Sequence, residues 1–339
     1  MNNNAISYFG LTTSQSQVLF SLERMLVVND IPKVIINYEK RAKVKKQWLS
    51  LWEKSINDYL THLDNSNSRL LMTRGEIEQS ILEENKKTET EVWKYLILLE
   101  CCFFAPYTPL GGTQEEIEES GKLVAGLKLD KKSREETLLD IATLLGIDSK
   151  YVEVFEKSKN AAFRRLSNYW FKIATTTGVF LLIALLALIP GLQAIAVAAA
   201  PAGLHGGAAV LAGLAALGGG AVAAGGLGVA GGIAVVVGGG ALLGISAGGT
   251  VGFLIASISS NAVLGESVKL EVVLREIVLA IQNDTIQFQQ ILNKLSAEKE
   301  ALKLELEKLK KAQKDNKKKI KELKKSIEYL ERLIKDLRR

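Results

Sequence analysis

Residues 179–200 read VFLLIALLALIPGLQAIAVAAA, in which Gln193 is the only strongly polar side chain. They belong to a segment, Ile173 to Gly265, that has 93 consecutive residues without Asp, Glu, Lys or Arg and holds 22 of the chain's 29 glycines. A soluble domain of this size carries charge on its surface. A membrane-spanning helix needs about 20 apolar residues, so residues 173–265 predict roughly two to four spans.

Small residues recur at every fourth position in the second half of this segment. Two runs keep that interval: Gly220, Ala224, Gly228, Gly232, and then Gly240, Gly244, Gly248, Gly252. This spacing places small side chains on one face of a helix, where two backbones approach closely in lipid. The pattern predicts membrane helices that pack through glycine faces, with chance matches in a glycine-rich segment as the alternative.

The charges of the chain lie on either side of this segment and divide it into three parts. Residues 1–172 carry 24 basic and 24 acidic side chains, residues 173–265 carry none, and residues 266–339 carry 19 basic and 13 acidic ones. In residues 1–172 apolar residues recur at three- and four-residue spacing without strand alternation, which predicts a bundle of roughly six or seven helices. We expect this bundle to be a sensor or regulatory domain in an all-α protein.

Residues 266–339 keep a heptad repeat and contain neither proline nor glycine. The core positions of the expected coiled coil include Leu302, Leu306, Leu309, Ile320, Leu323, Ile327, Leu330, Ile334 and Leu337. Ile at position a with Leu at position d favours a parallel two-stranded coil, and therefore a homo-oligomer. As one straight helix this part would be about 110 Å long. The polar layer at Gln313 and Asn316 leaves a second interpretation, an antiparallel helical hairpin, which the unbroken heptad phase disfavours.

Part of the amino-terminal region is similar to a known family of helical domains. The residues that carry the similarity are Tyr95 to Glu100, the turn and helix start from Gly111 to Glu116, and Arg134 to Asp148. On these residues, positions 94–157 resemble TerB-like domains, small helical bundles that often accompany membrane-associated stress and defence proteins. The acidic turn typical of that family is missing, because Pro106 to Gly112 contains no carboxylate. The family's metal-related properties are therefore not transferred to this chain.

The sequence offers no recognisable catalytic chemistry. It has two histidines, no P-loop and no cluster of metal-ligand residues. Gly226 to Gly231 matches the glycine spacing of a dinucleotide-binding turn, but the next acidic residue is Glu266, too far away to hold a ribose. Cys101 and Cys102 stand between apolar neighbours and are predicted to be core residues. We therefore predict no enzyme activity, no cofactor and no metal site.

Basic residues in front of the uncharged segment predict its orientation. Lys157, Lys159, Arg164, Arg165 and Lys172 precede it, so we expect a multi-pass membrane protein with a cytoplasmic amino-terminal domain. The flank after the segment is ambiguous, and an even number of spans would keep both flanks on one side. Residues 297–339 have a surplus of seven basic side chains. Such a face could meet anionic lipid or nucleic acid. Solvation of a coil exterior explains the surplus better than either, because acidic residues are interspersed and Tyr329 is the only aromatic residue there.

Together these features predict a self-associating membrane effector whose partner is the lipid bilayer. Its glycine-faced helices would insert and perturb or perforate the membrane, as in a pore-forming toxin or a bacterial defence effector. The alternative is a non-catalytic, membrane-anchored tether or scaffold that uses the coiled coil to reach a partner.

Overall fold

The computed structural model describes residues 11, 13–31, 39–64, 71–107, 114–167, 260–311 and 317–339. Their regular secondary structure is entirely helical, with no strand in these ranges, which confirms the all-α class. Residues 173–259, with all seven glycines expected to pack in the membrane, lie outside them. Within the described ranges no helix combines the length and hydropathy that crossing a bilayer requires.

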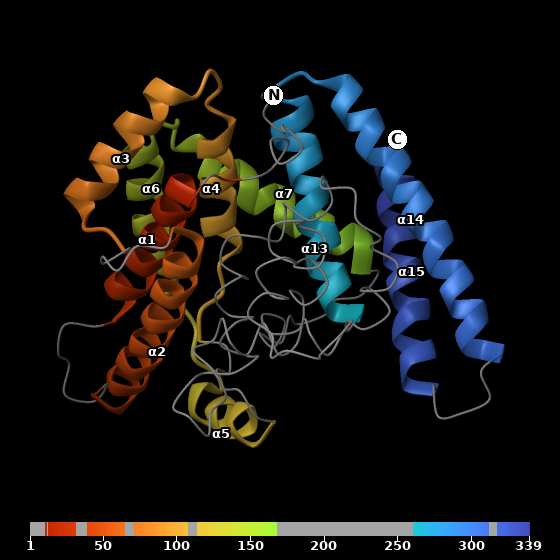
Figure 1. Ribbon diagram of the computed structural model, residues 1–339, viewed down its shortest axis with the longest axis horizontal. Helices are drawn as coiled ribbons and strands as arrows, with labels where there is room; N and C mark the ends of the chain where they lie inside the picture. The colour runs from red at the N-terminus through yellow and green to blue at the C-terminus, as the bar shows by residue number, and fades with distance from the viewer. Residues whose placement is uncertain are drawn as a thin grey trace. The chain divides into compact units, whose positions relative to one another are not determined.

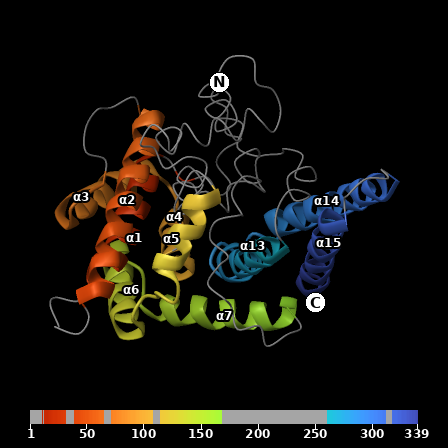
Figure 2. The ribbon, with the colours of Figure 1, turned by 90° about the horizontal axis from the view of Figure 1, so that it is seen from below.

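The chain divides into two compact units, and residues 11–152 make up the described part of one of them. Its helices are α1 (Thr13–Asp30), α2 (Glu39–Asp64), α3 (Arg74–Lys87), α4 (Val92–Phe103), α5 (Gln114–Val124), α6 (Lys131–Leu145) and the first turn of α7 (Lys150–Ser167). Helix α1 packs against α2, α3, α4 and α6 (Figures 1 and 2). Leu19, Phe20 and Leu22 are fully buried on α1, so this helix is at the centre of the unit.

The local sequence fixes where α6 begins and ends. Asp130 caps its amino terminus, since the carboxylate accepts a hydrogen bond from the backbone N–H of Ser133 at 2.9 Å. Gly146 follows the last turn with a φ of 68°, a left-handed conformation that glycine adopts without steric cost. These two signals bound an amphipathic helix whose apolar side chains Leu138, Ile141 and Leu145 are buried.

The other unit contains the rest of α7, from Glu153, and the helices that follow residue 259. These are α13 (Ser260–Val272), the π-helical turn η4 (Val273–Leu279), α14 (Thr285–Lys311) and α15 (Lys317–Leu337). Helix α13 continues directly into η4, and the chain then reverses at residues 280–284, where Asn283 has a left-handed φ of 54°. Helix α15 packs against both α13 and α14, as Figure 2 shows.

Helices α14 and α15 form an antiparallel hairpin. Lys303 Nζ lies 2.8 Å from Glu331 Oε1, and Arg338 donates a hydrogen bond to Ser296 at 3.2 Å. An advance of seven residues along α14 is thus matched by a step of seven residues backwards along α15. The expectation of one continuous helical rod over 266–339 is therefore wrong, and the disfavoured hairpin interpretation describes this part of the chain.

The heptad positions are nevertheless buried, within one chain. Seven of the nine expected core residues are buried, and Leu309 and Ile320 are half-buried. Leu333 and Ser326, at the neighbouring g position of the same repeat, are fully buried as well. A two-stranded coil buries only a and d, whereas α15 needs a wider apolar face because it packs against two helices.

Candidate functional site

The helices on either side of the uncharged segment contact each other through side-chain hydrogen bonds. Helix α7 ends at Ser167 and α13 begins at Ser260. Arg165 donates to Glu271 Oε1 through Nε, at 3.0 Å, and also through Nη2, while Ser158 donates to Glu276 Oε1 at 2.7 Å. Moving forward from Ser158 to Arg165 corresponds to moving backward from Glu276 to Glu271. The two flanking helices are therefore antiparallel, so the end of α7 and the start of α13 are directed towards the same end of this unit.

Helix α15 closes this arrangement through Asp336. Its Oδ2 lies 2.8 Å from Arg165 Nε and 3.1 Å from Arg275 Nη2. Arg275 also places its Nε 3.2 Å from Glu271 Oε1. These four residues, Arg165, Glu271, Arg275 and Asp336, are called the ion-pair cluster below. It connects α7, α13 with its continuation η4, and α15, so the hairpin is fastened to both flanks of the uncharged segment.

A hydrogen bond to the backbone strengthens the attachment of α15. Arg332 donates from Nη1 to the carbonyl oxygen of Leu166 at 2.8 Å. That carbonyl belongs to the last turn of α7, whose oxygens have no partner within the helix. The charged guanidinium is a strong donor for such a group. The end of α7 is thus held by side chains from both α13 and α15.

The two carboxyl groups of the cluster have pKa values shifted in opposite directions. Burial raises the pKa of Glu271, whose side chain is 0% exposed, and a hydrogen bond with Asp336 acts in the same direction. Burial would also raise the pKa of Asp336, but that hydrogen bond and the charges of Arg165 and Arg275 lower it. Glu271 Oε2 is buried without a donor. The opposite shifts mean that Glu271 binds a proton more readily than Asp336 does.

A second buried polar cluster lies in the unit formed by residues 11–152. Asp30, with a side chain that is 0% exposed, accepts hydrogen bonds from Lys45 Nζ at 2.5 Å, from the Tyr107 hydroxyl, and from the backbone N–H of Asp130 at 2.6 Å. Burial and then the hydrogen bond to Asp30 raise the pKa of Tyr107. Each contact ties the end of α1 to a different part of the chain. We read this cluster as structural, since its polar groups are directed at one another.

The cysteines are in the core of that unit, in agreement with their predicted role. Cys101 and Cys102 are both buried, and burial raises the pKa of the Cys101 thiol well above its usual value. A thiolate is the reactive form of cysteine, so this environment disfavours nucleophilic chemistry.

Sequence reasoning missed the ion-pair cluster, although one signal for it was available. Counting five heptads back from the expected core residue Leu306 places Glu271 at a core position. A carboxylate at such a position needs a buried basic partner. Residues 220–252, where the glycine faces were expected, remain outside the described residues.

Comparisons with known proteins give no match to this chain. No family model matches it, and neither a curated protein nor a solved structure does so. The resemblance of residues 94–157 to TerB-like domains therefore stays a prediction.

Proposed function

We propose that this chain is a non-catalytic, self-associating membrane effector that inserts its uncharged segment into a bilayer and perturbs or perforates it. The antiparallel pairing of α7 and α13 is the observation that carries the proposal. The hydrogen bond between Arg165 and Glu271 holds the two flanks of residues 173–265 together. Charged residues are costly inside a bilayer, so these flanks are expected outside it. A segment of this length whose two flanking helices are paired suits insertion from one side of a membrane.

The same pairing supports an even number of spans. Both flanks then stay on one side, and the basic residues before the segment place that side in the cytoplasm. The segment of 93 uncharged residues has room for two or four spans of about 20 residues each. In this topology the described units lie outside the bilayer on its cytoplasmic face.

Self-association is assigned to the glycine faces. The leucine and isoleucine side chains that would pair two coils, among them Leu323, Ile327 and Leu330, are covered within one chain. The runs from Gly220 to Gly232 and from Gly240 to Gly252 keep the spacing that lets membrane helices pack closely. Several copies could then assemble in the bilayer through these faces.

The tether or scaffold function has less support. It needs a long helix with an apolar seam that is open to a partner. Helix α14 has 27 residues and is paired with α15 along this hairpin. Its reach is about 40 Å at 1.5 Å per residue, well short of the expected rod.

Dye leakage from liposomes tests the proposal. We expect the full-length protein to release dye, and Gly244→Leu with Gly248→Leu to reduce release strongly because bulky side chains separate the packed backbones. The matched control is Ser246→Leu with Thr250→Leu. A helix would place this pair about 160° away from the glycine face, so the control adds the same leucines without blocking it.

The outcomes separate the two functions. Release that is lost in the glycine variant and kept in the control supports an effector that assembles through glycine faces. Full dye retention by wild-type protein bound at saturation to the liposomes would overturn the effector function and favour a passive anchor.

A further inference from the structure

The hairpin formed by α14 and α15 gathers lysines at one end. Residues 308–325 contain ten lysines and two acidic residues. Six of these lysines, all exposed, are called the lysine tip: Lys310, Lys311, Lys317, Lys321, Lys324 and Lys325. Two come from the last turn of α14 and four from the first turns of α15, and these two helix ends lie at the same end of the hairpin.

Lysines of both helices surround Glu307. The Lys310 ammonium lies 2.5 Å from Glu307 Oε1, and this hydrogen bond lowers the pKa of Glu307. The charges of Lys311 on α14 and Lys324 on α15 lower it further. The tip therefore already stabilises one anionic group at its edge.

The lysine tip lies at the end of the unit where α13 begins. Helices α13 and α15 pack side by side, and Glu271 shares its arginines with Asp336. Ser260 is eleven residues before Glu271, and Lys325 is eleven residues before Asp336. Because both are helical, Ser260 and Lys325 lie at similar levels, and the residues from Lys325 back to Lys317 extend about 12 Å further.

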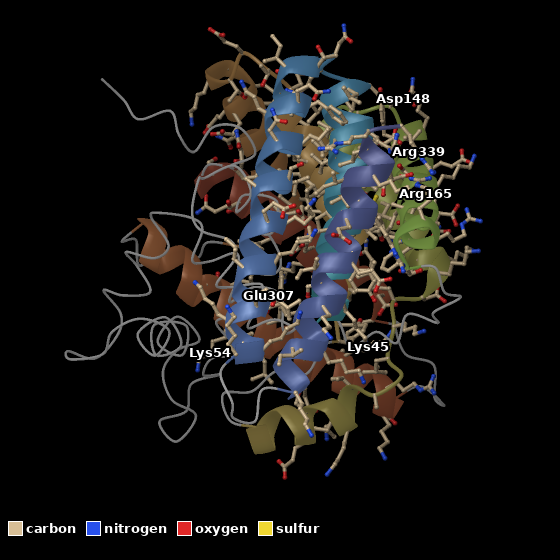
Figure 3. All side chains as sticks on the ribbon, turned by 90° about the vertical axis from the view of Figure 1, so that its right-hand side faces the viewer. Lys45, Lys54, Asp148, Arg165, Glu307 and Arg339 are labelled. Carbon is tan, nitrogen blue, oxygen red and sulfur yellow. The ribbon has the colours of Figure 1, made fainter. Side chains whose placement is uncertain are left out.

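The figures agree with this placement. Figure 1 shows the start of α13 at the same end of the unit as the end of α14 and the start of α15. In Figure 3 Glu307 lies near that end of the hairpin, whereas Arg165 and Arg339 lie towards the other end.

We propose that the lysine tip docks onto the anionic headgroups of the membrane that receives the uncharged segment. This inference rests on the proposed function, because it uses the bilayer into which residues 173–265 would insert. A membrane that lies beyond this end of the unit would meet the tip before it meets Ser260, so its headgroups would contact the lysines (Figure 1). Clustered lysines at a cytoplasmic surface each contribute attraction to anionic lipid.

Anionic lipid fits the tip better than nucleic acid. Lysines bind phosphate-bearing surfaces as point charges, without the planar geometry that arginine offers to bases. The tip has no arginine among residues 308–325, and its sequence has no aromatic residue there for base stacking.

Vesicle flotation tests the inference with two charge-matched variants of the full-length protein. The tip variant is Lys321→Glu with Lys325→Glu, and the control is Lys335→Glu with Arg339→Glu. Both pairs are exposed and four residues apart near opposite ends of α15, and both change the net charge equally. Circular dichroism melting checks that each variant folds. The vesicles are pure phosphatidylcholine or equal parts phosphatidylcholine and phosphatidylserine.

We expect wild-type protein to prefer the phosphatidylserine vesicles, and this preference to fall with added salt. In the tip variant, the preference for phosphatidylserine vesicles should fall by at least about 30-fold, because each lysine near an anionic surface contributes about 1 kcal/mol. The control should keep the wild-type preference. A preference that survives in the tip variant, or falls equally in both variants, overturns the inference. The inference is also overturned if binding of a double-stranded DNA oligonucleotide requires the tip while vesicle binding does not.

The failures of the two proposals can be told apart. If wild-type protein releases dye equally from both vesicle types and shows no phosphatidylserine preference, the lysine tip inference fails and the effector function stands. If binding to phosphatidylserine depends on the tip but dye is retained, the inference stands and the effector function fails.

Discussion

The carboxyl groups of Glu271 and Asp336 share the guanidinium groups of Arg165 and Arg275, although the two acidic residues are 65 positions apart in the sequence. The fully buried carboxyl group of Glu271 has lost its hydration, and hydrogen bonds from the two arginines compensate for that loss. The cluster therefore determines whether α7, α13 and α15 stay together. Its members can be changed one at a time, which makes its contribution measurable.

Removing Arg165 should destabilise the protein far more than removing an exposed lysine from the same helix. We expect Arg165→Ala to lower the free energy of unfolding by about 2–4 kcal/mol, because it leaves Glu271 and Asp336 with one arginine. Lys157→Ala is the control, since Lys157 and its partner Glu153 are 75% and 69% exposed. Such a pair contributes about 0–1 kcal/mol. Urea unfolding in detergent, followed by circular dichroism, would contradict this prediction if both variants lost the same amount.

The raised pKa of Glu271 predicts a pH dependence of stability. The folded protein binds the Glu271 proton more tightly than the unfolded chain, in which the carboxyl group releases it near pH 4.5, so stability should fall as the pH rises from 4.5 through the raised pKa of Glu271. Glu271→Gln imitates the neutral form and should remove this fall. Urea unfolding of both proteins across that range makes the comparison.

An acidic residue with a lowered pKa provides the control for this experiment. Arg74 donates to both carboxylate oxygens of Asp140, at 2.5 and 2.8 Å, and lowers its pKa. The stability that Asp140 contributes is present above its ordinary value of 3.8 and is lost as the pH falls below it. Asp140→Asn should therefore leave the slope above pH 4.5 unchanged. If Glu271→Gln kept the wild-type slope, the proton would not be on Glu271.

Leu333 distinguishes the hairpin from a two-stranded coil. It occupies a g position, which a two-stranded coil exposes, but it is 0% exposed in this protein. Leu333→Ala should therefore cost about 2–5 kcal/mol, as a large-to-small change in a packed core does. Leu304→Ala is the matched control, because Leu304 is 67% exposed and its loss should cost less than about 0.5 kcal/mol. Equal thermal melting of the two variants would favour an intermolecular coil.

The sequence allowed the burial pattern of the hairpin to be predicted, but not its direction. Positions a and d lie on one face of a helix in any coil, so Leu323, Ile327 and Leu330 were expected in a core, and they are buried. Whether that face meets another chain or the neighbouring helix depends on the turns, which periodicity does not register.

The chain reversal before α14 has only a weak signal in the sequence, because it involves neither proline nor glycine. Asn283 adopts a left-handed φ, which asparagine tolerates better than most residues. Asp284 then accepts a hydrogen bond from the backbone N–H of Gln287 at 2.8 Å and caps the new helix. The pair Asn283 and Asp284 thus indicates a helix start that an uninterrupted heptad count overlooks. The heptad pattern marked Glu271 as a charged residue at a core position, but its partners Arg165 and Asp336 could not be predicted, because they meet it only after the chain has reversed direction three times.

Asp30 should be among the most sensitive positions of the unit formed by residues 11–152. Asp30→Ala leaves Lys45, which is 11% exposed, without its carboxylate, and an uncompensated buried charge costs about 3–5 kcal/mol. Urea unfolding can be followed by tryptophan fluorescence, since the Trp48 ring lies 5.3 Å from that of Tyr107. Asp148→Ala is the control, because Asp148 is 54% exposed and caps the start of α7, which contributes about 1 kcal/mol. A midpoint that moved no further in Asp30→Ala than in Asp148→Ala would show that the buried cluster does not hold α1 in place.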